Sequence, residues 1–302
     1  MVIERAAIGG QAATTEKLDN VPGFPQSISG QDFSLRLREQ VEQFGAEILQ
    51  AQEIKSVTRH DNYHIVTTED GSEYSAIAVL IATGSRYRHL GVEGENDYIG
   101  AGVHFCATCD GPFYKGKEIA VVGGGDSASE ESLLLTKFAK KVVILVRQDK
   151  LKASQIIQDK VLSHPKVEVR WNTEVKAFLG DKSHHQLKFK KMQLVNNKTG
   201  EESELEIDGV FIFIGLDPNT SFLANSSIVL NQWNFIVTGH DLVHDTPAPT
   251  EFKGREPTFL ESSVPGIFVA GDVRSGSTKQ VVSAAGEGTA VSIMIREYLK
   301  TI

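Results

Sequence analysis

The stretch HFCATCDG, residues 104–111, holds both cysteines of the chain, Cys106 and Cys109, followed directly by Asp110. Two thiols separated by two residues can close a small disulfide ring that reacts by thiol–disulfide exchange, and a nearby helix N-terminus or cation favours the attacking thiolate. Asp110 adds a proton carrier, or is only a turn or N-cap residue. A structural zinc site would need His104 and a distant ligand such as His240 or His244, because there is no second CxxC. The pattern favours a redox pair over zinc or chance spacing.

A glycine-rich turn follows the cysteines. The run IAVVGGGDSASEE places Gly123, Gly125 and Ala128 in a G-x-G-x-x-A arrangement between an apolar strand and a helix. The first glycine makes the turn, the second lets the backbone approach a pyrophosphate, and the small third residue lets helix and strand pack closely. The N-H groups at the helix N-terminus favour an anion. The run therefore indicates a dinucleotide site, with a plain tight turn as the alternative.

The residues after the next strand indicate which dinucleotide binds. The strand VVILVR ends in Val146 and Arg147, where an acid would be expected to bind the 2'-hydroxyl of the adenosine ribose. Arg147, Lys150 and Lys152 suit a 2'-phosphate better. We expect NADPH in preference to NADH, and the alternative is that these cations form a solvated turn.

The elements that must position these residues alternate between short apolar runs and helical stretches. This order predicts parallel sheets built from βαβ units. The alternating elements are MVIE, FSLRLREQVEQFGA, AVLIATG, EIAVVGGGD, SASEESLLLTKFA and VVILVR. Residues 63–79 and 185–215 instead alternate polar and apolar positions around a turn, which predicts antiparallel hairpins.

Two residues near the chain ends suggest a second nucleotide. Asp272 follows an apolar strand and precedes a helix expected to begin near Lys279, so it either holds a ribityl hydroxyl beside a pyrophosphate or caps the helix. Glu4 ends the strand MVIE as a ribose-binding acid does, and its glycine turn should lie about 20 residues upstream. We therefore expect the first strand, glycine turn and first helix of this domain to be missing. The alternative is a plain edge strand.

Length and charge exclude several classes of protein. The 302 residues favour two domains, and the net charge of -8 offers no general attraction to nucleic acid or to an anionic membrane. No apolar run approaches the roughly 20 residues that span a bilayer, so we expect a cytoplasmic protein. Two cysteines do not make a structural disulfide framework.

Several motifs occur together in one order from Met1 to the C-terminus. They are GGQ from Gly9, NVPGFP from Asn20, IATGS from Ile81, CATCDG, VVGGGDSASEE and VPGIFVAGDVRSG. Together they closely resemble the bacterial low-molecular-weight thioredoxin reductases, class II pyridine nucleotide-disulfide oxidoreductases, without that family's N-terminal FAD glycine motif. The resemblance implies an α/β fold with two Rossmann-like domains, parallel sheets and antiparallel hairpins. Residues 1–89 and 218–302 would form a discontinuous, N-terminally incomplete FAD domain, and residues 90–217 an NAD(P)H domain carrying the CxxC.

The resemblance also implies cofactors, site residues and partners. It places at FAD positions Glu4, Gly10, Gln11, Asn20, Thr83, Gly84, Gly271, Asp272 and Gln280. It places at NADPH positions Gly123, Gly125, Asp126, Ser127, Arg147 and Lys152. It implies that Cys109 accepts electrons from the flavin and that Cys106 carries out the exchange with thioredoxin or a thioredoxin-like protein. It implies that Asp110 is the general acid. It further implies a homodimer. We expect no metal, because the two cysteines with His104 close by fall short of four ligands at tetrahedral spacing.

One departure from the family concerns the 2'-phosphate. The family's HRR, followed by an arginine, is replaced by VRQ followed by Lys152, and lysine lacks the arginine fork. This change leaves open a related flavin disulfide reductase with another electron donor or acceptor.

The missing FAD glycine motif leaves open a second alternative, a degenerate flavoprotein without turnover because its FAD site is truncated.

Overall fold

A computed structural model describes residues 1–15, 18–183, 186–244, 252 and 255–302. The chain divides into two compact units, which are treated separately. The terminal unit comprises Met1–Arg86 and Asp217–Ile302, and the central unit comprises Tyr87–Leu216. The chain passes between them along β7 (Ser85–Tyr87) and β16 (Leu216–Pro218), which pair as a two-stranded sheet. This confirms the expected α/β class, with parallel and antiparallel sheets.

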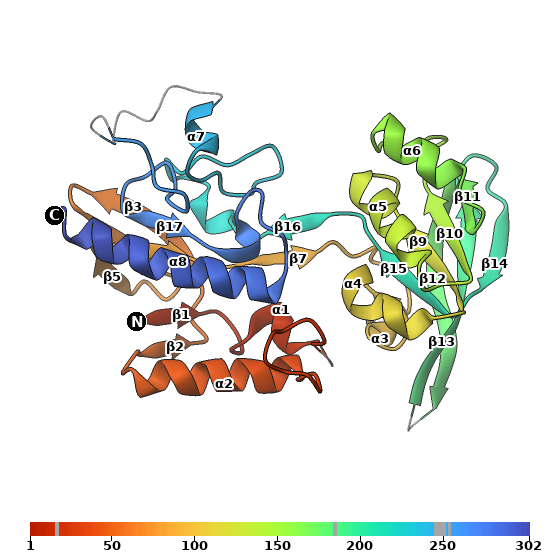
Figure 1. The fold of residues 1–302 in the computed structure, drawn as a ribbon, viewed down its shortest axis with the longest axis horizontal. Helices are drawn as coiled ribbons and strands as arrows, with labels where there is room; N and C mark the ends of the chain where they lie inside the picture. Colours follow the sequence, from red (N-terminus) through yellow and green to blue (C-terminus); the bar gives the residue numbers. More distant parts are fainter. Residues whose placement is uncertain (16–17, 184–185, 245–251, 253–254) are drawn as a thin grey trace. The chain divides into compact units, whose positions relative to one another are not determined.

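The central unit is built on a five-stranded parallel sheet (Figure 1). In spatial order its strands are β11 (Val167–Trp171), β10 (Lys141–Val146), β9 (Glu118–Val122), β15 (Gly209–Ile212) and β8 (Val103–His104). Helices α5 (Asp126–Leu135) and α6 (Gln155–Leu162) lie on one face. The other face carries an antiparallel sheet of β12 (Thr173–Ser183), β13 (Gln186–Asn196) and β14 (Glu202–Glu206).

Alternating side chains of the parallel strands fill two separate cores. Ile119 and Val121 of β9 belong to the cluster that contains Ala128 and Leu135 of α5. Ala120 and Val122, which alternate with them in β9, belong to the cluster beneath β12 and β13. Because successive side chains of a strand point to opposite faces, an unbroken apolar run is what a sheet covered on both faces requires.

One predicted strand pairing is wrong. Gly209–Ile212 was expected within the second antiparallel hairpin, but as β15 it lies parallel to β9 and β8. All four residues are buried, which is typical of an inner strand of a parallel sheet and not of a half-exposed hairpin. The hairpin itself is confirmed as β13 paired with β14, and it is extended by β12, which was not predicted.

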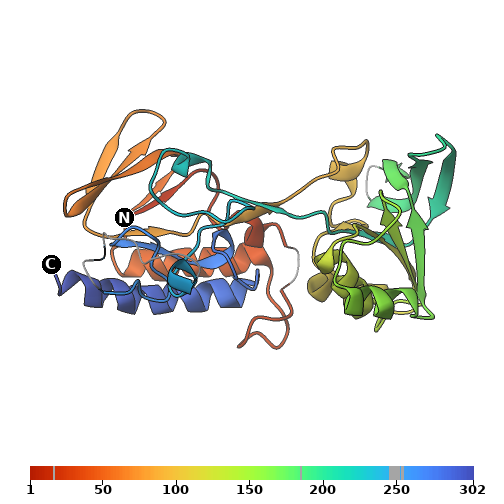
Figure 2. The same ribbon diagram turned by 90° about the horizontal axis from the view of Figure 1, so that it is seen from above.

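Besides the β7–β16 pair, three sheets lie in the described part of the terminal unit. Two are parallel pairs, β1 (Val2–Glu4) with β2 (Ile48–Gln50) and β17 (Ile267–Val269) with β6 (Val79–Ile81). The third is the antiparallel sheet of β3 (Ile54–His60), β4 (Tyr63–Thr68) and β5 (Glu73–Ala76), whose β4–β5 hairpin was expected. Helices α2 (Gly30–Gln43) and α8 (Val281–Leu299) lie on the opposite side of the unit from this sheet (Figure 2).

The remaining elements are short. The α-helices are α1 (Gly10–Ala13), α3 (Glu95–Tyr98), α4 (Ala107–Asp110) and α7 (Asp241–His244). The 3-10 turns are η1 (Gly111–Tyr114), η2 (Ser221–Leu223) and η4 (Gly271–Val273). The expected site residues lie at the ends of strands, in these short elements, in the turns beside them and at the N-termini of α5 and α8.

Candidate active site and nucleotide sites

The two cysteines are joined by a disulfide at the start of α4. The Cα atoms of Cys106 and Cys109 lie 5.3 Å apart. Cys106 is the N-cap residue of α4, and the backbone N-H of Cys109 donates a hydrogen bond to Cys106 Sγ at 3.2 Å. Both residues are half-buried. The sulfurs are therefore held in a fixed place and remain partly open to a reaction partner.

Asp110 lies beside an imidazole and a phenol. Its Oδ2 is 3.4 Å from Nδ1 of His104, and Nε2 of His104 is 2.6 Å from the hydroxyl of Tyr114. His104 and Tyr114 are buried, whereas Asp110 is half-exposed. Burial, followed by the negative charges of Asp110 and Asp208, raises the pKa of Tyr114 well above its ordinary value, so its hydroxyl stays neutral.

A metal site was the alternative use of the two cysteines. Among the described residues there is no group of three or more His, Cys, Asp or Glu side chains placed to hold a metal ion. Both sulfurs are used in their mutual bond. The geometry suits thiol–disulfide exchange next to a group that can carry a proton.

In the glycine turn between β9 and α5, Gly123 and Gly125 have different backbone conformations and different space for a side chain. Gly123 has a φ of 145°, and a Cβ there would come within 2.4 Å of the carbonyl oxygen of Phe213 and 2.8 Å of Ala128 Cβ. Gly125 has a φ of -88°, and a Cβ there would meet nothing within 4 Å. Gly123 therefore serves the packing of the turn, whereas Gly125 leaves an open approach to the N-terminus of α5.

The loop after β10 is tied to this turn by two backbone N-H groups. Lys152 N donates to Gly124 O at 2.7 Å, and Ser154 N donates to Asp126 Oδ1 at 2.9 Å. Ser127 is exposed in the first turn of α5. The expected NADPH positions in this turn and loop are thus held together in one region of the central unit.

The cations of this loop are exposed. Arg147 follows β10, and its carbonyl oxygen accepts a hydrogen bond from Asn197 Nδ2 at 2.8 Å. Within the described part of the chain, neither Arg147 nor Lys152 has a carboxylate partner. Unpaired cations at the end of the second strand of a dinucleotide fold suit a phosphate ligand.

In the terminal unit, two amides 260 positions apart meet. Asn20 Nδ2 donates to Gln280 Oε1 at 2.8 Å. The loop before α2 packs there, since Leu18, Val21 and Ile28 form a small core against Val281 of α8. Polar amides at the N-terminal end of a helix suit the polar groups of a dinucleotide.

Two further expected positions adjoin a residue that the sequence did not reveal. Thr83 Oγ1 donates to Asn219 O at 2.8 Å, and Asn219 Nδ2 donates back to Thr83 O at the same distance. Asn219 N also donates to Gly84 O at 3.0 Å. Gly84 has a φ of 67° and open space where a Cβ would lie. The bond between residues so far apart in sequence could not be inferred from spacing.

The end of β17 gathers buried charge. Burial raises the pKa of Asp272, while Lys279 opposes and Glu287 reinforces this shift. Lys279 Nζ donates to the carbonyl oxygens of Asp272 and Arg274 at 2.8 and 3.1 Å, and burial lowers its pKa. Gly271 N donates to Glu287 Oε2 at 2.7 Å. Glu287, Arg274 and Lys279 were not singled out from the sequence.

The remaining expected FAD positions lie near the N-terminus. Glu4 Oε1 accepts a hydrogen bond from Ala6 N at 2.9 Å just after β1. Gly10 begins α1 with a φ of 49° and open space at its Cβ position, and Gln11 beside it is exposed. Open glycines, amides and a desolvated carboxyl together form a donor set that fits FAD.

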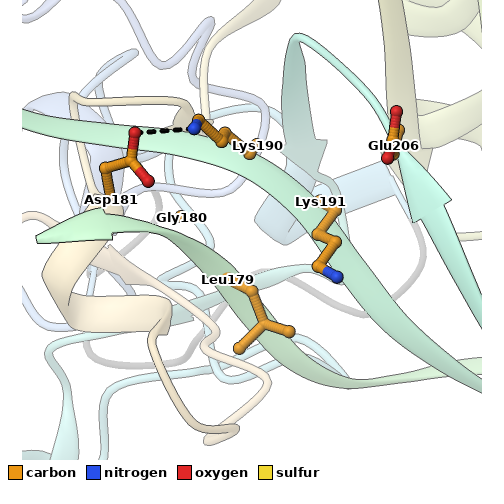
Figure 3. Close-up of a pocket in the computed structure, with 6 residues that line it drawn as sticks. All are labelled: Leu179, Gly180, Asp181, Lys190, Lys191 and Glu206. Carbon is orange, nitrogen blue, oxygen red and sulfur yellow. Dashed lines mark ion pairs between the residues drawn. The ribbon is translucent and has the colours of Figure 1, made fainter.

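Surface hollows lie elsewhere. Figure 3 shows one on the antiparallel sheet of the central unit, where Asp181 pairs with Lys190 at 2.6 Å. It is also lined by Leu179, Gly180, Lys191 and Glu206. A second, in the terminal unit, is lined by residues of β3 and of the turn after it, by the segment 225–228, and by Val264 and Ile267. Neither of these two hollows contains an expected site residue.

Helix composition gives one further finding. No helix in the described part of the chain is both long enough and apolar enough to cross a membrane.

Comparison with known proteins relates the whole chain to one family. Residues 1–288 match the family described as pyridine nucleotide-disulphide oxidoreductase. A thioredoxin reductase of Bacillus subtilis (strain 168) is 40% identical over 302 residues, covering 100% of this chain and 87% of the relative. One of Treponema pallidum (strain Nichols) is 36% identical over 302 residues, covering 100% and 90%.

Two solved structures extend this likeness to the fold. The crystal structure of thioredoxin reductase from Streptococcus pyogenes MGAS5005 has a TM-score of 0.85 and 35% identity, over 99% of this chain and 90% of that one. The thioredoxin reductase from Giardia duodenalis has a TM-score of 0.83 and 30% identity, over 96% and 87%.

Proposed function

Since the chain belongs to the thioredoxin reductases of the pyridine nucleotide-disulphide oxidoreductase family, we propose that it passes electrons from NADPH through FAD and the Cys106–Cys109 disulfide to oxidised thioredoxin. The protein is an NADPH-dependent thioredoxin-disulfide reductase. The observation that carries the mechanism is the half-buried disulfide at the start of α4, followed directly by the carboxyl of Asp110. A structural disulfide would need no acid beside it.

Members of this family use FAD, which accepts a hydride from NADPH and supplies two electrons to the disulfide when it is bound. The terminal unit supplies the residues that would hold it. Asn20 and Gln280 offer paired amides, Asp272 a carboxyl, and Gly10 and Gly84 an open backbone. We assign the remaining contacts to Glu4, Gln11, Thr83 and Gly271.

The central unit is the NADPH domain in this proposal. Gly123 makes the turn, Gly125 lets the pyrophosphate approach the N-terminus of α5, and Asp126 and Ser127 line that approach. Arg147 and Lys152 are exposed cations without carboxylate partners among the described residues, which supports their binding the 2'-phosphate.

The cysteines and Asp110 carry out the exchange. The Cys106 thiolate attacks one sulfur of the thioredoxin disulfide, forming a mixed disulfide and releasing a thiolate that takes a proton from Asp110. Cys109 then attacks Cys106 Sγ, which restores the Cys106–Cys109 bond and frees reduced thioredoxin. Over one turnover, NADPH and one proton reduce one disulfide to two thiols. Cys109 N-H, which already donates to Cys106 Sγ, stabilises negative charge on that sulfur.

The setting of the enzyme is also proposed. We expect a homodimer that acts in the cytoplasm and has no nucleic-acid partner. The family resemblance supports the dimer, and the net charge of -8 argues against general attraction to nucleic acid.

Steady-state turnover tests this function. NADPH oxidation should depend on added oxidised thioredoxin and should produce one equivalent of dithiol for each NADPH consumed. The Cys109→Ser variant, which keeps the size of the side chain, should lose thioredoxin reduction entirely. Wild-type enzyme that carries FAD but reduces no thioredoxin would refute the proposal.

A further inference from the structure

His104 is an ionisable residue in the core that the exchange chemistry leaves unused. It ends β8, two positions before Cys106, and its side chain is only 7% exposed. Its ring lies 5.3 Å from the rings of both Tyr114 and Phe211. Both of its nitrogens face polar atoms: Nδ1 faces Asp110 at 3.4 Å and Nε2 faces the Tyr114 hydroxyl at 2.6 Å.

We propose that His104 is a positioning residue for Asp110, holding its carboxyl beside the cysteines through Nδ1-H while the Tyr114 hydroxyl fixes the ring tautomer. This role rests on the exchange function proposed above and deepens it. Burial alone requires that both ring nitrogens of a core histidine find polar partners, but it does not require that one partner be an acid next to a disulfide.

The tautomer follows from the two partners. Tyr114 stays neutral, so its hydroxyl can donate to Nε2 of a neutral imidazole. The ring proton then resides on Nδ1, which lies 3.4 Å from Asp110 Oδ2. The hydrogen bond at Nε2 fixes the ring, and the fixed ring orients Nδ1 toward Asp110. A metal-binding histidine is oriented in the same way by the group that its second nitrogen contacts.

Other charged groups face this cluster and set its electrostatics. Asp208 adds negative charge near Tyr114, and Lys117 Nζ lies 5.1 Å from the Tyr114 ring centre. Helix α5, which packs against α4, carries the half-buried Glu131, and burial raises the pKa of that carboxyl. Asp110 and Asp208 both place negative charge near the Tyr114 phenol. Further negative charge on Asp110 or a cysteine needs a donor, and Nδ1-H of His104 supplies one.

His104 acts in the proton-transfer step of the exchange. When the leaving thiolate of thioredoxin takes the proton of Asp110, one O-H bond breaks, one S-H bond forms, and no electrons are transferred. The new carboxylate accepts the hydrogen bond from Nδ1-H. In the reverse direction, the same carboxylate takes the proton of the Cys106 thiol. Without Nδ1-H, the Asp110 carboxylate is less stable, and the Cys106 thiolate, whose proton that carboxylate accepts, forms only at higher pH.

Two substitutions separate the two arms of the ring. The amide nitrogen of Asn can take the place of Nδ1, so His104→Asn retains a donor to Asp110 and loses the contact with Tyr114. The amide of Gln reaches the place of Nε2, so His104→Gln retains the Tyr114 contact and loses the Asp110 arm. Tyr114→Phe removes only the hydroxyl that fixes the tautomer. A purely structural role makes no such distinction between Asn and Gln.

The readout is the pH dependence of iodoacetamide alkylation of the reduced dithiol, which requires neither FAD nor thioredoxin. We expect His104→Gln to move the midpoint upward by roughly half to one pH unit, Tyr114→Phe to move it less, and His104→Asn to leave it near that of the wild type. In turnover with thioredoxin, His104→Gln should lower kcat about tenfold, a part of the usual general acid effect, and leave the KM for NADPH unchanged.

A matched control comes from the same unit. Nδ1 of His89 lies at the same 3.4 Å from Glu95 Oε1, so its polar partner is Glu95 and not Asp110. Its ring packs on that of Phe105, at 5.1 Å, and His89→Gln should not move the alkylation midpoint. Equal shifts for His104→Asn and His104→Gln, or no shift for His104→Gln, would overturn the positioning role. If the alkylation pattern holds but the wild type reduces no thioredoxin, the proposed function fails and the positioning role stands.

Discussion

Two alanine substitutions in the glycine turn separate folding from nucleotide binding. In Gly123→Ala, the new Cβ lies 2.4 Å from a backbone oxygen that cannot move freely, at a φ of 145°. The unfavourable φ costs about 1–3 kcal/mol and the overlap a similar amount, so we expect a loss of roughly 3 kcal/mol in the free energy of unfolding. At this size of domain, that corresponds to a Tm lower by about 10 °C.

Gly125→Ala should have the opposite profile. At a φ of -88°, alanine is unstrained and its Cβ meets nothing within 4 Å, so stability should change by less than about 1 kcal/mol. The methyl group instead occupies the open space through which a pyrophosphate would reach the N-terminus of α5. We expect the KM for NADPH to rise at least about tenfold, equivalent to ~1.4 kcal/mol of binding.

Thermal unfolding by circular dichroism and NADPH-dependent thioredoxin reduction measure the two effects side by side. The reasoning is refuted if Gly125→Ala lowers the Tm as much as Gly123→Ala does. It is also refuted if Gly125→Ala retains the wild-type KM for NADPH.

Three further predictions concern single side chains. Asp110→Asn should lower kcat for thioredoxin about a hundredfold or more while flavin reduction by NADPH, followed by stopped flow, keeps its rate; equal loss in both steps would contradict its role. Arg147→Ala should raise the KM for NADPH roughly tenfold and leave that for NADH unchanged, and parallel changes would exclude it from the 2'-phosphate site. Burial raises the pKa of Glu131, so the stability from its protonated form is present below the unfolded-state pKa and is lost as pH rises through the folded-state pKa. Glu131→Gln should therefore raise the Tm at pH 7 but not below about pH 4, and the same gain at both values would be evidence against this explanation.

Local patterns in the sequence predicted those parts of the fold that depend on local rules. The strand before Gly123, the helix after it and the hairpin around Asp70 and Gly71 follow from periodicity and turn residues. The pairing of β15 did not, because a short apolar run fits an antiparallel or a parallel neighbour equally well until burial on both faces is known.

The same distinction applies to the candidate site. The CxxC and the glycine turn are contiguous motifs and were found directly. The bonds of Thr83 to Asn219 and of Asn20 to Gln280 join residues far apart in sequence, so only the fold brings them together. His104 was noticed as a possible zinc ligand, but its place between Asp110 and Tyr114 depends on the ring orientation at the end of β8, which no spacing rule supplies.

The most direct test of the central claim is the visible spectrum of the purified protein with FAD during one reductive cycle. We predict a flavin absorption band that bleaches with NADPH under anaerobic conditions and returns when excess oxidised thioredoxin is added. In Cys106→Ser the band should bleach normally but not return. A band that NADPH does not bleach, or one that thioredoxin restores equally well in Cys106→Ser, would contradict electron transfer from NADPH through flavin and this disulfide.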